Sequence, residues 1–326
     1  MAKARRAIQI LREDGFLLFV LKSLEYVTHP LHDPLFKPAI NRLYSGGTDM
    51  AKEEWDHLLI LDACRADMFE EDVGPVGEQY ERVRSNASAT PEWIERTFSE
   101  KRLGDTVYVT SNPWASREAP DSFHDIVNLW VEETELEHAD IQQIEGNLDD
   151  VDLDLPDTIP ARKVTDRALE VASEYPRKRV IVHYFQPHAP CIGKPNGTEL
   201  DEPLGLHALA EEFLRGDVTR EEVWDAHCDN LAYAWHHAKR YIDEVDGRIV
   251  VSADHGELFG EFLFPFLMSG YSHPRNLHHP YLTTVPWAVF EKEHREISDD
   301  GCNSVLINEE ANRARLKHLG YMVDSS

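Results

Sequence analysis

The stretch "IVVSADHGELFGE", residues 249–261, joins an apolar, β-branched run to a carboxylate and an imidazole. Asp254 and His255 stand side by side, directly after residues that are typical of a buried strand. Together they offer an oxygen and a nitrogen ligand at one fixed point, which suits a divalent metal. The alternative is a strand end followed by a helix, in which Asp254 caps the helix and His255 has no role.

Two other apolar runs end in side chains of the same kind. "LLILDACRAD" (58–67) stops at Asp62, and "VIVHYFQPHAP" (180–190) carries His183 and His188. In an open α/β sheet, ligands bind beyond the carboxyl ends of the parallel strands. The three strand ends therefore predict one shared, metal-centred site.

The elements that must position this site alternate along the chain from about residue 50. Strands are expected at 57–62, 106–111, 179–185, 248–254 and 284–291, and helices at 91–101, 160–174 and 219–245. Strands that are separated by helices pair in parallel, in a sheet covered on both faces. We predict a three-layer α/β/α sandwich with a mostly parallel central sheet over residues 49–326, preceded by a separate arm, residues 1–48.

Charge and cysteine usage limit the class of protein. The 326 residues include 60 Asp and Glu against 33 Lys and Arg, for a net charge of −27, so nucleic acid is excluded as a general partner. This excess favours a protein of a halophilic archaeon over an ordinary acidic cytosolic enzyme, because concentrated salt screens self-repulsion. Four widely spaced cysteines with no C-x-x-C indicate reduced thiols, and hence a cytoplasmic location.

The arm reverses this charge balance. Residues 1–22 are basic and contain "FLLFVL" (16–21), which is too short to span a membrane. A basic amphipathic helix can lie on an anionic surface, so we expect residues 1–45 to contact the inner face of the membrane peripherally. The alternative is that this helix packs on the main domain. If it anchors, deleting residues 1–45 should release the protein without abolishing turnover.

The segments together resemble a known superfamily. "LLILDACRAD", "HYFQPHAP", "VVSADHGELFGE" and "GYSHPRNLHHPYLTTVPW" occur in the order expected of the alkaline phosphatase superfamily, and look like its sulfatase-type branch. The similarity covers roughly residues 53–321 and closes with "RARLKHLGY" (313–321), which resembles the last helix of many such chains. The resemblance implies an alkaline phosphatase-like fold, in which the Asp-His pair holds a divalent metal against the ester that is cleaved.

The resemblance also assigns roles to single residues. Asp62, Asp254 and His255 match the metal ligands, and His273 in "YSHP" matches a histidine that binds a second ion or the substrate. His188 matches the substrate-group or second-site histidine. Other interpretations remain open: His183 as a core histidine, His278 or His279 in place of His273, and Glu257 as a first-turn helix carboxylate.

The nucleophile must come from "RSNASATPEWIERTF" (84–98), which contains no cysteine to become a sulfatase formylglycine. Ala89, two residues before Pro91, cannot attack an ester. Pro91 suits the first position of a helix, which makes Thr90 its N-cap, among N–H groups that can hold an oxyanion. A metal would lower the pKa of the Thr90 hydroxyl and bind it. The alternatives are a plain N-cap, or Ser88 as nucleophile.

We therefore predict a metal-dependent hydrolase or transferase that acts on phosphate or sulfate esters, phosphate preferred, through a covalent intermediate on Thr90. His188, His273 and Arg65 would bind the developing charge. One or two divalent ions are expected, Mn, Zn, Mg or Ca, with Mn or Zn fitting best because Ala63 follows Asp62 where sulfatases often have another carboxylate. The substrate would be a small-molecule or a glycan- or lipid-linked ester. The alternative is a catalytically inactive relative, a binding or scaffold protein at the membrane surface.

Overall fold

The computed structural model describes residues 28, 31–112, 114–129, 132, 158–204, 218–263 and 269–302. The basic segment 1–22 and the expected closing helix 313–321 lie outside these residues. So does most of the upstream arm.

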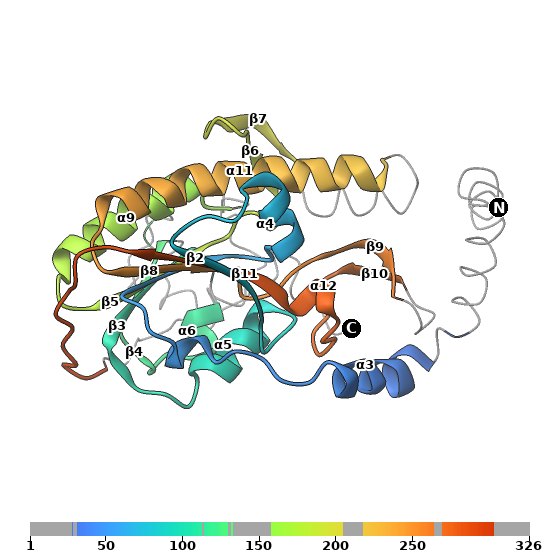
Figure 1. Cartoon of the computed structure of the whole chain (residues 1–326), viewed down its shortest axis with the longest axis horizontal. Helices are drawn as coiled ribbons and strands as arrows, with labels where there is room; N and C mark the ends of the chain where they lie inside the picture. The colour runs from blue at the N-terminus through green and yellow to red at the C-terminus, as the bar shows by residue number, and fades with distance from the viewer. Residues whose placement is uncertain are drawn as a thin grey trace, which may run out of the picture.

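A seven-stranded sheet forms the centre of the described chain (Figure 1). Its strands are β1 (His57–Leu61), β2 (Gln79–Arg84), β3 (Leu103–Thr110), β4 (Phe123–Asn128), β5 (Arg179–Tyr184), β8 (Arg248–Ser252) and β11 (Thr284–Glu291), in the order β2-β11-β8-β1-β5-β3-β4. β8, β1, β5, β3 and β4 pair in parallel, while β11 is antiparallel to both β8 and β2. The carboxyl ends of β1, β5 and β8 consequently meet at one edge of the sheet.

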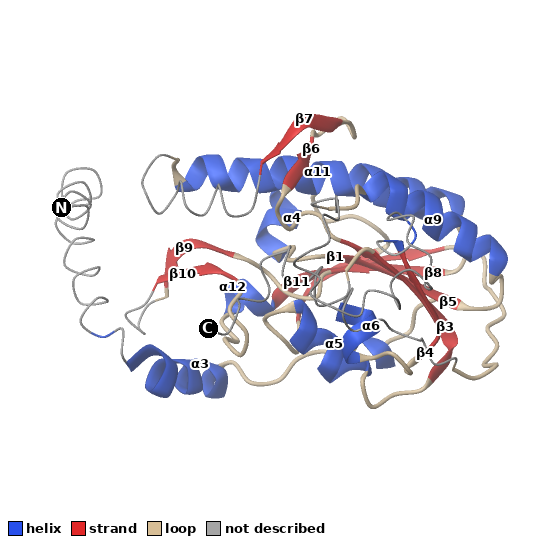
Figure 2. Cartoon of the chain, turned by 180° about the vertical axis from the view of Figure 1, so that it is seen from behind, coloured by secondary structure: helices blue, strands red, loops and turns tan. Residues whose placement is uncertain are grey.

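Helices cover both faces of this sheet (Figure 2). They are α4 (Ala66–Asp72), α5 (Thr90–Phe98), α6 (Trp114–Glu118), α9 (Ala161–Glu174), α11 (Arg220–Glu244) and α12 (Pro280–Thr283). α9 and α11 lie on one face, and α5 and α6 on the other. The predicted three-layer, mostly parallel architecture is confirmed.

α11, the longest helix among the described residues, begins where its sequence supplies a cap. The Thr219 hydroxyl accepts the Glu222 N–H at 3.2 Å, and the Glu222 carboxylate accepts the Thr219 N–H at 2.7 Å. This reciprocal pair satisfies two of the N–H groups that a helix start leaves without partners.

Two hairpins stand outside the sheet. β6 (Cys191–Gly193) pairs with β7 (Glu199–Leu204), and β9 (Leu258–Phe262) pairs with β10 (Ser269–Ser272). β9 follows the Asp-His pair, so the interpretation of Glu257 as a first-turn helix carboxylate is wrong. The strand-to-helix alternative for "SADHGE" fails for the same reason.

The described part of the arm packs on the main domain. After a π-helical turn (His32–Phe36), α3 (Lys37–Leu43) buries Ile40 completely in a small cluster with Leu258, Leu263, Leu277 and Leu282. A 3-10 turn (Met50–Lys52) leads from there into β1. Deleting residues 1–45 would remove Ile40 and expose this cluster, so the structure argues against our expectation that the deletion leaves turnover in place. The division at residue 48 stays a prediction.

His57 is a buried histidine at the start of β1, far from the strand ends that carry the site. The Arg295 guanidinium donates to its Nε2 at 2.7 Å, so its Nδ1 carries the proton and donates to the Tyr241 hydroxyl at 2.8 Å. Burial, followed by the charge of Arg295, lowers the pKa of His57 from 6.5 to about 3. The folded chain therefore keeps His57 neutral where the unfolded chain takes up a proton.

Because the unfolded state binds the extra proton, His57 makes the folded state less stable as pH falls below 6.5. We expect this one group to remove roughly 2 kcal/mol of the free energy of unfolding between pH 6.5 and about 5. Urea unfolding at both values measures it. His57→Gln should reduce this pH dependence; an unchanged slope in the variant would contradict the assignment.

Candidate active site

Asp254 and His255 follow β8 and are completely buried. One carboxylate oxygen of Asp254, Oδ1, accepts the backbone N–H of Ala63 at 3.1 Å and of His255 at 2.9 Å. The other, Oδ2, has no hydrogen-bond donor although it is buried. A buried carboxylate oxygen without a donor is costly unless a cation sits beside it.

The imidazole of His255 is oriented by the backbone. Its Nδ1 donates to the carbonyl of Gly256 at 2.9 Å, which leaves the lone pair of Nε2 directed at the carboxylates. Nε2 lies 3.2 Å from Asp254 Oδ2 and 3.6 Å from Asp62 Oδ1. Gly256 permits this turn because a Cβ there would lie 2.2 Å from the carbonyl oxygen of Tyr281.

Asp62 completes the set from the end of β1. It is also completely buried, and Asn112 donates to its Oδ2 at 3.2 Å. Burial, and then the charge of Asp254, raise the pKa of Asp62 well above its usual range. Asp254 differs because its burial is outweighed by His255 and His183, which hold its pKa below the usual value. Two buried carboxylates whose ligand atoms lie within 4.8 Å repel each other when both are ionised, and a cation beside them would offset that repulsion.

These residues fit a divalent metal. Asp62, Asp254 and His255 each offer a ligand atom, and the three atoms lie within 4.8 Å of one another. Two carboxylate oxygens and one neutral imidazole suit Zn or Mn, and leave room for a further ligand.

Thr90 supplies that further group. Its Oγ1 lies 3.1 Å from His255 Nε2 and 3.5 Å from each carboxylate oxygen of Asp62. Thr90 is the first residue of α5 and Ala89 is the N-cap, one residue earlier than we expected. A metal ion held by the three ligands would be adjacent to this hydroxyl.

Ser88, the other candidate nucleophile, is used elsewhere. Its hydroxyl lies 3.1 Å from Glu92 Oε2 and 3.0 Å from the carbonyl of Pro274, and it accepts the N–H of Leu277 at 3.1 Å. None of these partners belongs to the metal set. The geometry favours Thr90.

A second group of possible ligands lies beside the first. His188, Glu257 and His273 also bring ligand atoms within 4.8 Å of one another. The His273 ring centroid is 4.6 Å from that of His255 and 4.9 Å from that of His188. Glu257 accepts from His273 Nδ1 at 2.8 Å. Burial raises the pKa of Glu257, but the imidazoles of His273, His188 and His227 together lower it to about 2. The sequence argument missed Glu257 as a member of this group.

Of the other histidines considered from the sequence, His183 lies at the wall of the site, whereas His278 and His279 lie outside both ligand groups. His183 Nδ1 is 2.8 Å from the Tyr108 hydroxyl, and its Nε2 lies 3.8 Å from Asp62 Oδ2, so it forms part of the site's wall. His278 pairs with Glu92 at 3.0 Å, and His279 caps α12. Neither belongs to either ligand group, which favours His273 over both.

Arg65 does not contact Thr90 or the carboxylates of the metal set in any described interaction. It pairs with Asp67 and Glu261, and donates to the carbonyl of Glu257 at 3.3 Å. Its guanidinium carbon lies 4.4 Å from the ring centroid of Tyr281. These contacts brace the turn that carries His255, whereas we had expected Arg65 to bind the substrate's charge.

His188 lies on a loop that is held by a buried asparagine of α11. Asn230 donates to the carbonyls of Pro187 at 3.1 Å and His188 at 3.3 Å, and accepts the N–H of Ile192 at 3.1 Å. The sequence carries no local signal for this contact, because the partners lie about 40 residues apart.

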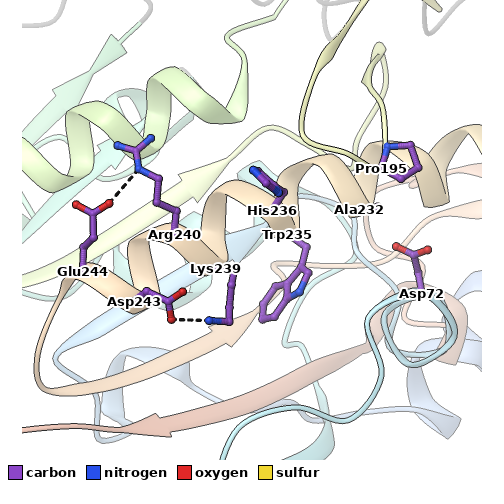
Figure 3. Close-up of a pocket in the computed structure, with 9 residues that line it drawn as sticks. All are labelled: Asp72, Pro195, Ala232, Trp235, His236, Lys239, Arg240, Asp243 and Glu244. Atoms are coloured by element: carbon purple, nitrogen blue, oxygen red, sulfur yellow. Dashed lines mark hydrogen bonds and ion pairs between the residues drawn. The ribbon is translucent and has the colours of Figure 1, made fainter.

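A groove of about 680 Å³ lies elsewhere, along α11 (Figure 3). It is crossed by the ion pairs Lys239–Asp243 and Arg240–Glu244, which α11 forms along its own surface. It is lined by Asp72, Pro195, Ala232, Trp235, His236, Lys239, Arg240, Asp243 and Glu244. None of these belongs to either ligand group, so this groove is not the site described above.

The sequence matches no model of a protein family, and no curated protein matches it. Solved structures with a similar fold include the integral membrane protein lipooligosaccharide phosphoethanolamine transferase A from Neisseria meningitidis (12% identity, TM-score 0.49, 89% of this chain and 59% of that one). This chain thus spans less than two thirds of that protein.

Two further structures share the architecture. One is the C-terminal periplasmic domain of EcEptC from Escherichia coli in complex with Zn (14% identity, TM-score 0.42, 76% of this chain and 75% of that one). The other is a protein of the alkaline phosphatase superfamily from Vibrio parahaemolyticus (13% identity, TM-score 0.36, 78% and 64%). The likeness is one of fold.

The cytoplasmic location that we predicted is contradicted by these comparisons, since the similar structures include a periplasmic domain and an integral membrane protein. All four cysteines are unpaired, but unpaired thiols do not establish where a protein is located. Among the described residues, no helix has the length and apolar character that crossing a membrane requires.

The metal ligands give a direct test. We expect the purified protein to bind one or two Zn or Mn ions per chain, and Asp254→Ala to abolish binding at the first group. Metal analysis after dialysis measures this, with Asp105→Ala as the control, because Asp105 pairs with Arg179 at 3.0 Å away from the ligand set. Zinc should also raise the melting temperature of the wild type and not that of Asp254→Ala. Equal metal content in the two proteins would overturn the assignment.

Proposed function

We propose that this chain is a metal-dependent enzyme of the alkaline phosphatase superfamily that cleaves or transfers phosphate esters through Thr90. The observation that carries the proposal is the position of the Thr90 hydroxyl, 3.1 Å from His255 Nε2 and 3.5 Å from both oxygens of Asp62. A hydroxyl at the start of a helix, beside two buried carboxylates and an imidazole, has the surroundings of an activated nucleophile.

Asp62, Asp254 and His255 would hold the metal, with Thr90 as a fourth ligand. When bound, the metal supplies positive charge that lowers the pKa of the Thr90 hydroxyl and polarises the ester oxygen. Thr90 Oγ1 attacks phosphorus in line with the leaving oxygen, so one O–P bond forms as the other breaks. The proton lost by Thr90 is balanced by the proton that the leaving alcohol gains from solvent.

The second group would act on the rest of the phosphate. His188 and His273 can direct N–H groups at its non-bridging oxygens, or hold a second ion together with Glu257. Water or an acceptor hydroxyl then attacks the phosphothreonine ester and regenerates Thr90. A hydrolase and a transferase differ only in that last acceptor.

Phosphate is proposed over sulfate because the chain has no cysteine at residues 84–98. Sulfatases of the resembled type need an aldehyde made from such a cysteine, whereas a hydroxyl suffices for phosphoryl transfer. A sulfatase activity is therefore not proposed.

The non-catalytic alternative rests on Ala89, which stands where a sulfatase-type chain carries its nucleophile. This non-catalytic alternative predicts that the protein binds metal but has no turnover. A panel of model phosphomonoesters, phosphodiesters and sulfate esters, run with Zn or Mn, separates the two functions. We propose a halophilic protein on the basis of its charge, so the panel should be run at both low and high salt.

We expect phosphoester turnover in this panel to exceed sulfoester turnover. Thr90→Ala should lower it by about a thousandfold or more, because removal of a nucleophile leaves only binding and charge stabilisation. Ser88→Ala should retain measurable activity, reduced because Ser88 holds Leu277. Full turnover by Thr90→Ala would contradict the proposal. Loss of activity in Ser88→Ala but not in Thr90→Ala would identify Ser88 as the nucleophile.

We also propose that the arm contacts a membrane surface. Among the described residues, the exposed large hydrophobic side chains are Leu31 (45%), Leu35 (54%), Leu43 (62%) and Tyr281 (38%). Leu31 and Leu35 stand four residues apart, and Leu43 follows eight residues later as the last residue of α3; we call these three side chains the leucine patch. Arg42, which is exposed beside Leu43, suits an anionic surface, whereas Lys37 is paired with Asp33 at 2.7 Å.

The free energy of burying the leucine patch limits how tightly it can bind a membrane. Burying three half-exposed leucines gives about 2–4 kcal/mol, which alone corresponds to weak binding. Stable association would therefore need the basic residues and "FLLFVL" of the upstream segment as well. The patch orients the protein, and the upstream segment adds affinity.

The double variant Leu35→Ser/Leu43→Ser should co-sediment several-fold less with anionic phospholipid vesicles, because it removes the two most exposed leucines in the described part of the chain. Turnover of a water-soluble ester should be unchanged. The matched control is Lys239→Ser/Glu293→Ser, on a surface away from the arm. If all three proteins sediment alike, the leucines of the arm do not bind the membrane.

A further inference from the structure

His273 lies on a loop without regular secondary structure, residues 273–279, between β10 and α12. We call it the His273 loop. Two residues at or in it, Ser272 and Asn276, have positive φ angles of 62° and 58°. Non-glycine residues adopt this conformation only where the surroundings hold them in it.

Three consecutive backbone N–H groups of the loop are bound by side chains from outside it. Asn276 donates to Glu92 Oε2 at 3.3 Å, Leu277 to Ser88 Oγ at 3.1 Å, and His278 to Asn41 Oδ1 at 2.8 Å. Ser88 and Glu92 belong to the turn and helix that carry Thr90, and Asn41 belongs to α3 of the arm.

Glu92 binds both the His273 loop and the turn that precedes Thr90. Its Oε2 accepts the N–H of Ser88 at 3.0 Å, and its Oε1 pairs with Arg96 at 2.7 Å and with His278 Nε2 at 3.0 Å. This buried carboxylate therefore joins the Thr90 turn to the His273 loop through donors from both.

Asn41 of α3 also binds Asn276 and His278, the two loop residues that Glu92 contacts. Besides accepting from His278, it donates to the carbonyl of Asn276 at 2.8 Å. Its neighbour Ile40 is buried against Leu277 and Leu282, which fixes α3 on the loop. α3 lies close to α12 and the β9–β10 hairpin in both views (Figures 1 and 2).

We propose that Glu92 and Asn41 are positioning residues that hold the His273 loop, and with it the His273 side chain, in a fixed position relative to Thr90. The arm is thus a structural part of the site as well as a surface element. The effect on turnover rests on the proposed function; the effect on the loop does not.

Amide hydrogen exchange tests the hold on the loop directly. In Asn41→Ala and in Glu92→Gln, peptides covering residues 273–279 should exchange about fivefold faster or more. Asn41→Ala removes the acceptor of the His278 N–H, and Glu92→Gln replaces one of two accepting oxygens by an NH2 group that cannot accept. The controls are Asn196→Ala, which removes an asparagine that binds the N–H of Thr198 in another loop, and Glu70→Gln, which removes the carboxylate partner of Arg82. Unchanged exchange in both test variants would overturn the proposal.

Turnover then separates positioning from a general loss of stability. Asn41→Ala should lower kcat about three- to tenfold in the wild-type background and have no further effect in His273→Ala, because both changes act through one side chain. Glu92→Asp should recover part of what Glu92→Gln loses. An equal loss from Asn41→Ala in the two backgrounds would show that it acts elsewhere, and would contradict the proposal. If the wild type has no turnover, the proposed function fails. The exchange experiment still tests whether Glu92 and Asn41 hold the His273 loop.

Discussion

The burial of Asp62 and Asp254 side by side is the constraint on which the rest of this structure depends. Neither carboxylate reaches water, and one oxygen of Asp254 has no donor. Removing two like charges from solvent costs far more than ordinary packing returns, unless a cation or a proton compensates it. The parallel sheet brings this about, because β1 and β8 are neighbours and end at the same edge. The remaining features of the site, the oriented His255 and the Thr90 hydroxyl at a helix start, place further ligands around the point where positive charge is needed.

The fold and the first ligand group could largely be predicted from the sequence. The strands over 57–61, 179–184 and 248–252 are apolar runs whose polar ends must converge once parallel pairing is assumed. Asp62, Asp254, His255 and Thr90 lie in short segments with their own local signals, namely an apolar run that stops, or a proline that starts a helix. The edge strands β2 and β4 were missed, because their alternating or mixed residues resemble exposed loops.

What the sequence could not supply were contacts between distant segments. A helix position for Glu257 stayed open because nothing local distinguishes a helix from the hairpin strand that follows it. Arg65 follows a ligand in sequence, yet its guanidinium turns away to Glu261 and the ring of Tyr281. Asn230, Glu92 and Asn41 are ordinary polar residues of helices, and their importance comes from loop amides about 40 to more than 180 positions away. Loop positioning is a tertiary property, which periodicity does not encode.

The central claim is that Thr90 is the residue that becomes covalently bonded to phosphorus. Trapping the intermediate tests it most directly: the zinc-loaded protein is mixed with a phosphoester, quenched in acid within the first turnover, digested, and the peptide that contains residues 84–98 is sequenced by mass spectrometry. We expect the transferred phosphoryl group on Thr90, and we expect it to be absent from Thr90→Ala and from wild-type protein stripped of metal. A phosphoryl group on Ser88 or on a histidine, or rapid turnover with no modified peptide at any quench time, would contradict it.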